Sequence, residues 1–295
     1  MKSVLPAAAL LAAALPLGTA CVVVDSQGHI ARDEKRFTVT GIPDLHLTTF
    51  DGSIEIRSGD AKTVVVEIEK RGPTQESIEQ LKVDAKQDGN RIDVEVTKPR
   101  GGDVVLFGIG HTSPTARLIV TMPRQGNVVA KSGDGSVRVE RIHGSLELRT
   151  GDGSIRAVDV GGTLVVQTGD GSVTLEDVEG DLDVNTGDGS VSVSGKPGLL
   201  RLHTSDGSIT VRADRGAAMK DDWTLSTGDG GIAVYLPSDF AAEVDAHTGD
   251  GTIRSELDIE NYSEMSRRSI KGKLGAGGKL LKIRTSDGSI RLKVS

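Results

Sequence analysis

The sequence predicts an all-β chain that winds as a single parallel β-solenoid, β-helix-like, with coils of about 18 residues and Asp-Gly corners. Three observations predict this fold class. Four consecutive 18-residue blocks, starting at Ser136, Ser154, Ser172 and Ser190, align without a gap. Each block alternates aliphatic and polar residues over two short stretches, which is typical of half-buried strands. Aromatic residues make up only 2% of the chain while glycine occurs 38 times, which suits short strands and tight turns.

The aligned blocks place aliphatic residues at positions 2, 4, 11 and 13 of each coil, as in Ile155, Ala157, Leu164 and Val166. Position 15 is always Thr, position 9 is always Gly, and positions 17 and 18 are always Asp-Gly. We expect the glycines at 9 and 18 to mark two corners where the backbone needs positive φ. Identical corners at a fixed period predict coils stacked in register, wound right-handed as parallel crossovers generally are. The alternative, an antiparallel meander with Asp-Gly hairpins, would not require every second turn to be identical.

The same signature continues on both sides of the regular blocks. Val128 and Ala130 fill the position 11 and 13 columns upstream, and Leu45 and Leu47 fill them again near the start. Downstream, Trp223 falls at position 11, so we expect it to fill the core. Between and beyond these coils we expect strands at 63–70, 91–97 and 115–122, a short helix at 74–81 capped by Thr74, and loops at 99–114 and 258–278.

The amino terminus has the features of an export signal. Lys2 precedes an apolar segment, Val4 to Leu17, which is too short to span a bilayer securely and is typical of a secretory signal peptide. Cys21, the only cysteine, follows directly. The run from Leu17 to Cys21 resembles a bacterial lipobox and predicts a lipid anchor on the Cys21 thiol, with Gly18 in place of the usual Leu. The alternative is ordinary cleavage after Ala20, which leaves a free thiol.

These features predict an exported protein of the periplasm, outer membrane or cell surface, held at the membrane through Cys21. The formal net charge is −7 and no basic stripe is present, which argues against nucleic acid and against electrostatic docking on anionic lipid. The predicted organisation is a signal peptide at 1–20, a lipid-anchor linker at 21–36 and a solenoid domain at 37–295. Within the solenoid domain we expect irregular first coils at 37–125, regular repeats at 126–213 and longer coils with a loop insertion at 214–295.

One aspartate in each coil precedes the corner glycine, so stacked coils would carry a column of carboxylates about 4.8 Å apart. Two exposed charges at this distance repel by about 0.9 kcal/mol in water. Either bound Ca²⁺ offsets this repulsion, or each carboxylate accepts hydrogen bonds from its own turn amides beside flanking Arg and Lys residues. The single Asp-Gly per 18 residues favours the second explanation. The column consists of Asp51, Asp134, Asp152, Asp170, Asp188, Asp206, Asp229, Asp250 and Asp287.

The remaining polar residues predict no catalytic site, cofactor site or metal site. The six histidines lack metal-ligand spacing, and His203 and His247 share an outward position. The Gly-rich segment 272–279 lacks the spacing of a P-loop, and neither a nucleophile elbow nor a zinc signature occurs. The threonine at position 15 shares the parity of the core residues, so we expect it to point inward and to hydrogen-bond with the backbone.

Several motifs carry a resemblance to a known family. These are Phe37-Thr38-Val39 and Ile42-Pro43 before the first Asp-Gly-Ser-Ile, the serial Thr-x-Asp-Gly-Ser-Ile/Val turns, and Gly275-Ala276-Gly277-Gly278 before the last turn. Over residues 35–295 the sequence resembles the bacterial putative-adhesin β-strand-repeat family of unknown function, related to head-GIN-type surface domains. The resemblance implies a β-helix-like fold and an envelope location, and it supplies no catalytic residues.

Two functions follow as hypotheses. The first is a non-catalytic, adhesin-like binding or structural module of the cell envelope, whose protein or polysaccharide partner the sequence does not specify. The alternative is a carbohydrate-active enzyme, because several β-helix folds carry polysaccharide lyases. An unpaired cluster of Asp or Glu with Arg or Lys in a groove would favour the enzyme.

Overall fold

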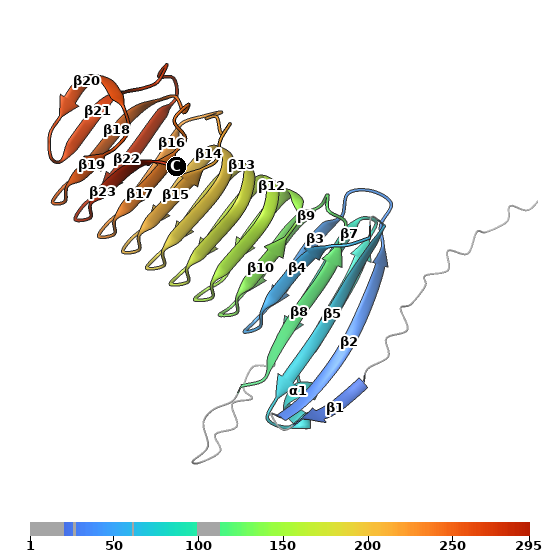
Figure 1. Cartoon of the computed structure of the whole chain (residues 1–295). Coiled ribbons are helices and arrows are strands. Elements are labelled where there is room, and N and C mark those ends of the chain that lie inside the picture. Colours follow the sequence, from blue (N-terminus) through green and yellow to red (C-terminus); the bar gives the residue numbers. More distant parts are fainter. Residues whose placement is uncertain (1–20, 26–27, 61, 99–112) are drawn as a thin grey trace, which may run out of the picture.

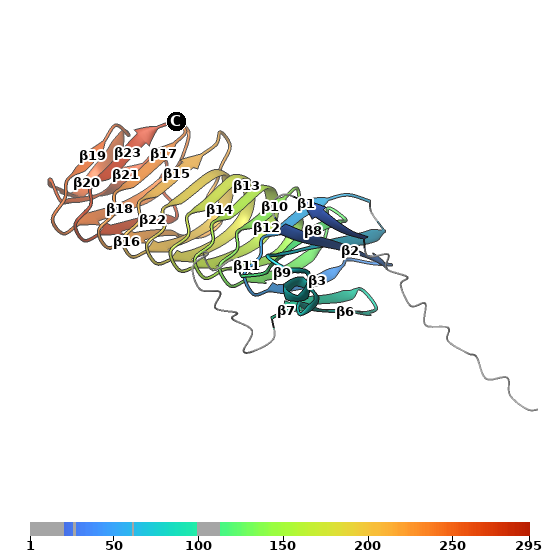
Figure 2. The same cartoon turned by 90° about the horizontal axis from the view of Figure 1, so that it is seen from below.

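The computed structural model describes residues 21–25, 28–60, 62–98 and 113–295. The predicted signal peptide and most of the predicted loop at 99–114 lie outside the described residues. The described chain forms 23 strands and one short helix, arranged as an elongated stack of coils whose strands lie in two facing walls (Figures 1 and 2). The all-β class and the mostly parallel pairing of the strands are therefore confirmed.

Wall 1 is built from positions 11–15 of the coils. Its strands, in spatial order, are β6 (Lys82–Asp88), β7 (Arg91–Thr97), β3 (Asp44–Thr49), β9 (Asn127–Ser132), β11 (His143–Arg149), the second halves of β12 (Ile155–Thr168), β13 (Val173–Thr186) and β14 (Val191–Thr204), then β16 (Trp223–Thr227), β22 (Leu280–Thr285), β18 (Ala242–Thr248), β21 (Ser269–Leu274) and β20 (Ile259–Met265).

Wall 2 is built from positions 2–4. Its strands, in spatial order, are β1 (Cys21–Asp25), β2 (Gly28–Thr38), β5 (Thr63–Gly72), β8 (Thr115–Met122), β4 (Ile54–Ser58), β10 (Val137–Glu140), the first halves of β12 to β14, then β15 (Ile209–Ala213), β17 (Ile232–Leu236), β23 (Ile290–Val294) and β19 (Ile253–Ser255).

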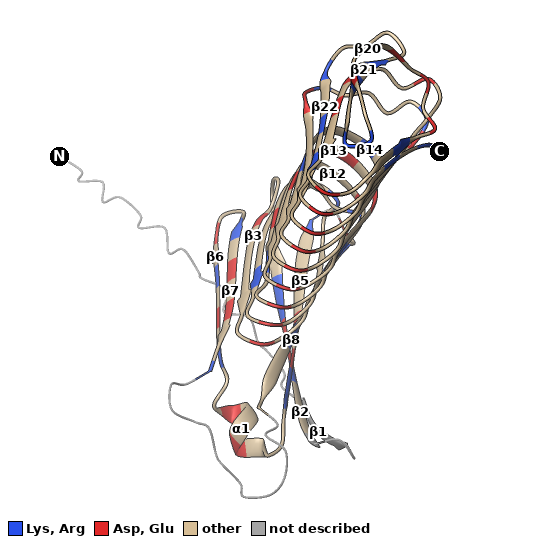
Figure 3. Ribbon diagram, turned by 90° about the vertical axis from the view of Figure 1, so that its left-hand side faces the viewer, with Lys and Arg blue, Asp and Glu red and all other residues tan. Residues whose placement is uncertain are grey.

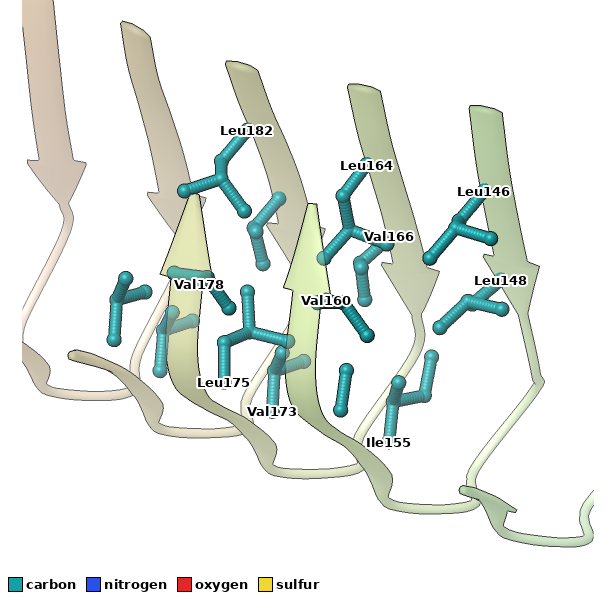
Figure 4. Packing of buried hydrophobic residues seen from close by; sticks show 14 of the residues in the cluster. Leu146, Leu148, Ile155, Val160, Leu164, Val166, Val173, Leu175, Val178 and Leu182 are labelled. Atoms are coloured by element: carbon teal, nitrogen blue, oxygen red, sulfur yellow. The ribbon is translucent and has the colours of Figure 1, made fainter. Parts of the chain in front are cut away.

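The central coils pair in register, as the repeat predicts. In wall 2, Ile155 lies beside Val173, and in wall 1, Leu164 lies beside Leu182, each 18 residues further along the chain. All the pairs between these coils are parallel, so the antiparallel meander is excluded for them. The aliphatic columns of the two walls face each other and form one continuous narrow core (Figure 4). Trp223 is fully buried and lies between Leu200 and Leu281, which confirms its core role.

The corner at position 9 bends the chain without ending the strand. Strands β12 and β13 run unbroken from position 2 to position 15. The bend uses left-handed backbone at position 6, where Asp159 and Asp177 have φ of 53° and 52°, and positive φ at the position 9 glycines of three blocks, Gly144, Gly162 and Gly180. In the fourth block Gly195 has positive φ and Gly198 does not, so the expectation for position 9 is wrong there. Position 7, which the sequence analysis did not identify, provides a further inward column at this corner, formed by Ile142, Val160 and Val178.

The corner at position 18 needs glycine for a different reason from the one expected. Gly171 does not have positive φ. A Cβ atom on Gly171 would overlap the carbonyl oxygen of Gly153 in the preceding coil, and the same overlap recurs from coil to coil. The expectation of positive φ at position 18 is therefore wrong, and the close approach of neighbouring backbones excludes every side chain there.

The threonine column joins neighbouring coils at this corner. The Thr168 hydroxyl is buried and lies 3.0 Å from the carbonyl oxygen of Gly153 and 3.2 Å from that of Gly151, to which it can donate. The Thr204 hydroxyl also accepts a hydrogen bond from the amide of Gly207, at 3.1 Å. The predicted inward orientation and backbone partners of the threonines are confirmed.

At both ends the spatial order of the coils departs from their order in the sequence. The first coil, β3 and β4, lies between the β7–β8 coil and the β9–β10 coil. The last coil, β22 and β23, lies between the β16–β17 coil and the β18–β19 coil, so the carboxyl terminus ends inside the stack (Figure 1). The chain therefore places its first and last coils inside the stack, each beside a coil that lies nearer to the end.

Antiparallel strands cover the amino-terminal end of both walls and the carboxyl-terminal end of wall 1, whereas wall 2 ends there with the parallel strand β19. The predicted strands at 63–70, 91–97 and 115–122 are confirmed as β5, β7 and β8. The predicted helix is α1 (Gln75–Glu79), and the Thr74 hydroxyl caps it by accepting the amide of Ser77 at 3.2 Å. No described helix has the length and apolar character needed to cross a membrane.

Two segments differ from the expectation. The predicted linker at 21–36 contains β1 and most of β2, and β2 pairs antiparallel with β5. The predicted loop at 258–278 contains the hairpin of β20 and β21, and β21 pairs with β18. Residues 260–265 of β20 are all exposed. Because neither face of the strand is buried along these residues, its sequence lacks the alternation of apolar and polar residues that predicts a strand. Backbone pairing at the end of a stack requires no such alternation.

Candidate functional site

The aspartate column does not form the site that its regularity suggests. All nine carboxylates are exposed, and acidic residues recur from coil to coil along the stack (Figure 3). The described residues contain no group of three or more His, Cys, Asp or Glu side chains that could hold a metal ion. The column therefore lies along the solenoid as a series of exposed charges, of which Asp250 pairs with Arg268 at 3.1 Å.

The expected hydrogen bonds from turn amides to these carboxylates are absent from the described corners. The turn amides donate to the preceding coil instead, as from Asp188 N to the carbonyl oxygen of Gly169 at 3.3 Å. Two of the flanking basic residues pair with other acids, Arg149 with Glu147 at 3.0 Å and Arg156 with Glu176 at 2.6 Å. The backbone groups of the corners form hydrogen bonds with neighbouring backbones and with threonine hydroxyls, not with the aspartates. Solvent screens the repulsion between neighbouring carboxylates.

A groove of about 370 Å³ lies at the opposite corner of the central coils. It follows the bend between the two walls, where β12, β13 and β14 pass from position 5 to position 9. Its lining is mostly charged and consists of Arg124, His143, Asp159, Val160, Asp177, Val178, Glu179, Gly195, Lys196 and Asp214. The apolar members belong to the inward column at position 7, which forms the floor beneath the charged residues.

One end of the groove is occupied by internal pairing. The guanidinium of Arg124 donates to both carboxylate oxygens of Asp159, at 2.9 and 3.0 Å. His143 Nε2 lies 3.1 Å from the same Arg124 nitrogen and 3.6 Å from Asp159 Oδ1. Because the guanidinium can only donate, the imidazole accepts at Nε2 in this arrangement. These three residues hold the shape of the groove and leave little charge free for a ligand.

The rest of the groove carries charges without ion-pair partners. Within the described part of the chain, no cation pairs with Asp177, Glu179 or Asp214, and no carboxylate pairs with Lys196. Asp177 takes left-handed backbone, which sets its side chain at the outside of the bend. The groove can therefore offer several carboxylate acceptors and one ammonium donor to a polar ligand, in an open and solvated setting.

The sequence analysis missed this groove because its residues occupy positions 5–9 of the coils, where the repeat varies most. The only signal was the aspartate at position 6 in two consecutive blocks, Asp159 and Asp177. Among the predicted outward histidines, His203 and His247 are both exposed, and His203 Nδ1 lies 2.9 Å from Ser226 Oγ. Cys21 is the first residue of β1, and the structure does not describe its side chain.

The stacked walls, the glycine corners and the antiparallel ends define a capped β-solenoid of mostly parallel strands. The chain belongs to the Toastrack DUF4097 family, whose profile matches residues 42–293. The family resemblance inferred from the motifs is confirmed.

Several solved structures are similar to the chain. A "putative adhesin" from Bacteroides fragilis is 13% identical over 90% of this chain and 97% of that chain, with a TM-score of 0.42. A "putative lipid binding protein" from Parabacteroides distasonis is 12% identical over 89% and 97%, with a TM-score of 0.44. A "putative cell adhesion protein" from Clostridium sporogenes is 14% identical over 90% and 100%, with a TM-score of 0.31. No curated protein matches the chain.

Proposed function

We propose that this protein is an exported, non-catalytic binding module of the bacterial cell envelope, held at the membrane by lipid on Cys21. The observation that carries the binding role is the groove, where Asp177, Glu179, Asp214 and Lys196 line a concave surface without ion-pair partners. A rigid stack of paired strands holds these groups in place, so a polar partner would meet a preorganised surface. Right-handed winding of the coils stays a prediction from the general preference of parallel crossovers.

A pull-down from detergent-solubilised envelope tests the binding role. The bait would be the mature chain, compared with a variant carrying Asp177→Asn and Asp214→Asn. We expect an envelope protein or polysaccharide that the wild type retains and the double variant loses. Equal recovery by both chains would remove the groove from the proposal. The double substitution Asp170→Asn with Asp183→Asn, at two exposed residues outside the groove, serves as a matched charge control.

The lipid anchor has its own test. The apolar segment that ends at Cys21 motivates the expectation that Cys21→Ser moves the protein from the membrane fraction to the soluble fraction. In a host with two membranes the outer membrane is the expected destination, because Val22 and not Asp follows the cysteine. A wild-type protein that is fully soluble and carries no acyl mass would contradict the anchor.

The same groove supports one alternative, a carbohydrate-active enzyme, because it contains carboxylates together with a lysine. Hydrolysis of a glycosidic bond needs two carboxyl groups on either side of the bond. Incubation with envelope polysaccharides should then release new reducing or unsaturated ends, and Asp177→Asn or Asp214→Asn should abolish this release. We favour the binding module because the groove is open to water and one carboxylate, Asp159, is already paired with Arg124.

A further inference from the structure

Two arginines stand side by side at the carboxyl-terminal end of wall 2. Arg254 of β19 and Arg291 of β23 are direct neighbours in the parallel register, so their side chains leave the same outer face. Both are exposed, and within the described part of the chain neither guanidinium pairs with a carboxylate. Like charges about 4.8 Å apart repel by about 0.9 kcal/mol in water. This pair therefore has a charge that nothing in the described chain offsets.

Two hydroxyl groups complete the arrangement. Thr252 and Ser289 precede the two arginines by two residues each, so all four side chains share one face of the wall. Their hydroxyl oxygens lie 3.4 Å apart. These four residues and Ile290 line a pocket of about 100 Å³. Guanidinium and hydroxyl groups are hydrogen-bond donors that suit the oxygens of a small oxyanion.

The central coils contain the same arrangement with its charge neutralised. Arg138 and Arg156 are also direct neighbours in wall 2, and each follows a serine by two residues. Glu140 lies 4.0 Å from Arg138, and Glu176 lies 2.6 Å from Arg156. At the carboxyl-terminal end Glu256 takes the place of Glu140, two residues after Arg254, but it pairs with Lys293 at 3.7 Å and not with an arginine. The difference between the two arginine pairs is therefore whether neighbouring acids pair with the arginines.

Two of the acids that neighbour the pocket residues in the sequence are ion-paired. Glu256 pairs with Lys293 at 3.7 Å, and Asp250 pairs with Arg268 at 3.1 Å. Asp287 is exposed at the corner, two residues before Ser289. Residues 242–295 carry ten Lys and Arg against eight Asp and Glu, whereas residues 126–241 carry ten against eighteen. The terminal segment is thus the positively charged part of an acidic protein, which favours the approach of an anion.

We propose that Arg254, Arg291, Thr252 and Ser289 bind a phosphate or sulfate group. Both guanidinium groups donate to the anion's oxygens, the two hydroxyls donate from the corner side, and the bound charge offsets the repulsion between the arginines. The group could be a free ion or one carried by a lipid headgroup, and both present the same tetrahedral oxyanion. The site is on the outer face of wall 2, away from the groove, so it does not depend on the proposed function.

Thermal melts and isothermal titration with inorganic phosphate, and separately with sulfate, test the site. We expect wild type to bind with a Kd of about 1 mM or below and to melt at a higher temperature as phosphate is added. Arg254→Gln with Arg291→Gln should weaken binding by about tenfold or more. The matched control, Arg138→Gln with Arg156→Gln, should bind as wild type does. Circular dichroism of each variant checks that the fold is intact.

A vesicle arm distinguishes the two sources of the anion. Tighter binding to vesicles of phosphatidic acid than to inorganic phosphate, lost in the Arg254/Arg291 variant, would indicate a lipid headgroup. Binding to inorganic phosphate without vesicle binding would indicate a free or polymer-borne group. Wild type that binds neither anion, or an equal loss of binding in the control variant, would overturn the proposal.

Discussion

The central coils and the two ends of this solenoid differ in how their strands are paired and covered. Between residues 126 and 213 each coil lies on the next one in the sequence, and the inward positions of the two walls recur after one turn, although the register shifts between β13 and β14 at the corner that joins the walls. At the ends the first and last coils lie inside the stack, and antiparallel strands occupy the outermost places except in wall 2 at the carboxyl-terminal end, where the parallel strand β19 is outermost. The outermost strands β6 and β20 expose mainly polar side chains, which opposes pairing with another chain. The repeated sequence therefore forms the core of the stack, and the irregular sequence forms the strands that end it.

The largest expected effect on stability comes from a substitution in the central core. Leu164→Ala removes a side chain that is 3% exposed between two coils, so we expect a loss of about 2–5 kcal/mol in the free energy of unfolding. Gln167→Ala, on the outer face of the same strand, should change stability by less than about 0.5 kcal/mol. Urea denaturation of both variants measures this. Equal losses would contradict the assignment of inner and outer faces.

A smaller effect tests the close approach of the corners. Gly171→Ala places a Cβ against the carbonyl oxygen of Gly153, and we expect a loss of about 1–3 kcal/mol from the resulting overlap. Gly161→Ala is the control, because its Cβ would meet only the ring of His143, 3.3 Å away, and its φ is not positive. We expect a change within about 0.5 kcal/mol there. Equal shifts of the denaturant midpoint in the two variants would show that backbone overlap is not the reason that the corner requires glycine.

The amino-terminal end should show its own dependence on pH. Burial of Glu69 favours the neutral carboxyl, but hydrogen bonds from Arg71 at 2.7 Å and Arg32 at 2.9 Å, with their charges, outweigh burial and lower the pKa of Glu69. A folded-state pKa below the unfolded value of about 4.3 adds stability above that pH, which is lost as the pH falls through the folded pKa.

We therefore expect the melting temperature of wild type to fall more steeply below about pH 4.3 than that of Glu69→Gln, which cannot titrate. Glu67→Gln, an exposed neighbour on the same strand, should keep the wild-type slope. Parallel melting curves for wild type and Glu69→Gln across this range would show that the pairing of β2 with β5 does not depend on the Glu69 charge.

The smallest expected effect concerns the aspartate column. Its carboxylates accept no hydrogen bond from the turn amides of the described corners, so Asp170→Asn and Asp170→Ala should both change stability by less than about 0.5 kcal/mol. A chelator should leave the melting temperature unchanged. A chelator-induced decrease of several degrees, reversed by Ca²⁺ and not by other salts, would show that the column binds calcium.

The periodic part of the fold could be predicted from the sequence, because each inward residue has its counterpart in the next coil. The core role of Trp223 and the inward threonines follow from their column alone. The inserted terminal coil could not be predicted in this way. Leu281, Ile283 and Thr285 fit the shared columns equally well at any layer, so the pattern specifies the register of β22 but not its place in the stack.

The two candidate sites could not be predicted from the sequence, for related reasons. The groove lies at positions 5–9, where the side chains vary, and its unpaired charges become visible only when Arg124 is seen beside Asp159. The terminal arginine pair was visible as two outward residues, but the sequence alone could not show that β19 and β23 are neighbours or that their acids are engaged elsewhere. Both depend on contacts between segments far apart in the chain.

The insertion of β22 and β23 has a consequence for biosynthesis. Residues 280–294 pair with earlier coils on both sides, so the layer that joins the β18–β19 coil to the rest of the stack is made after both of the coils that it joins. A chain that stops before residue 280 would lack an interior layer and leave two unpaired surfaces, whereas removing an end repeat from an ordinary array leaves one. The stack therefore closes only after β22 and β23 have followed all the earlier coils, and quality-control proteases would meet open strand edges on a chain that stops before them.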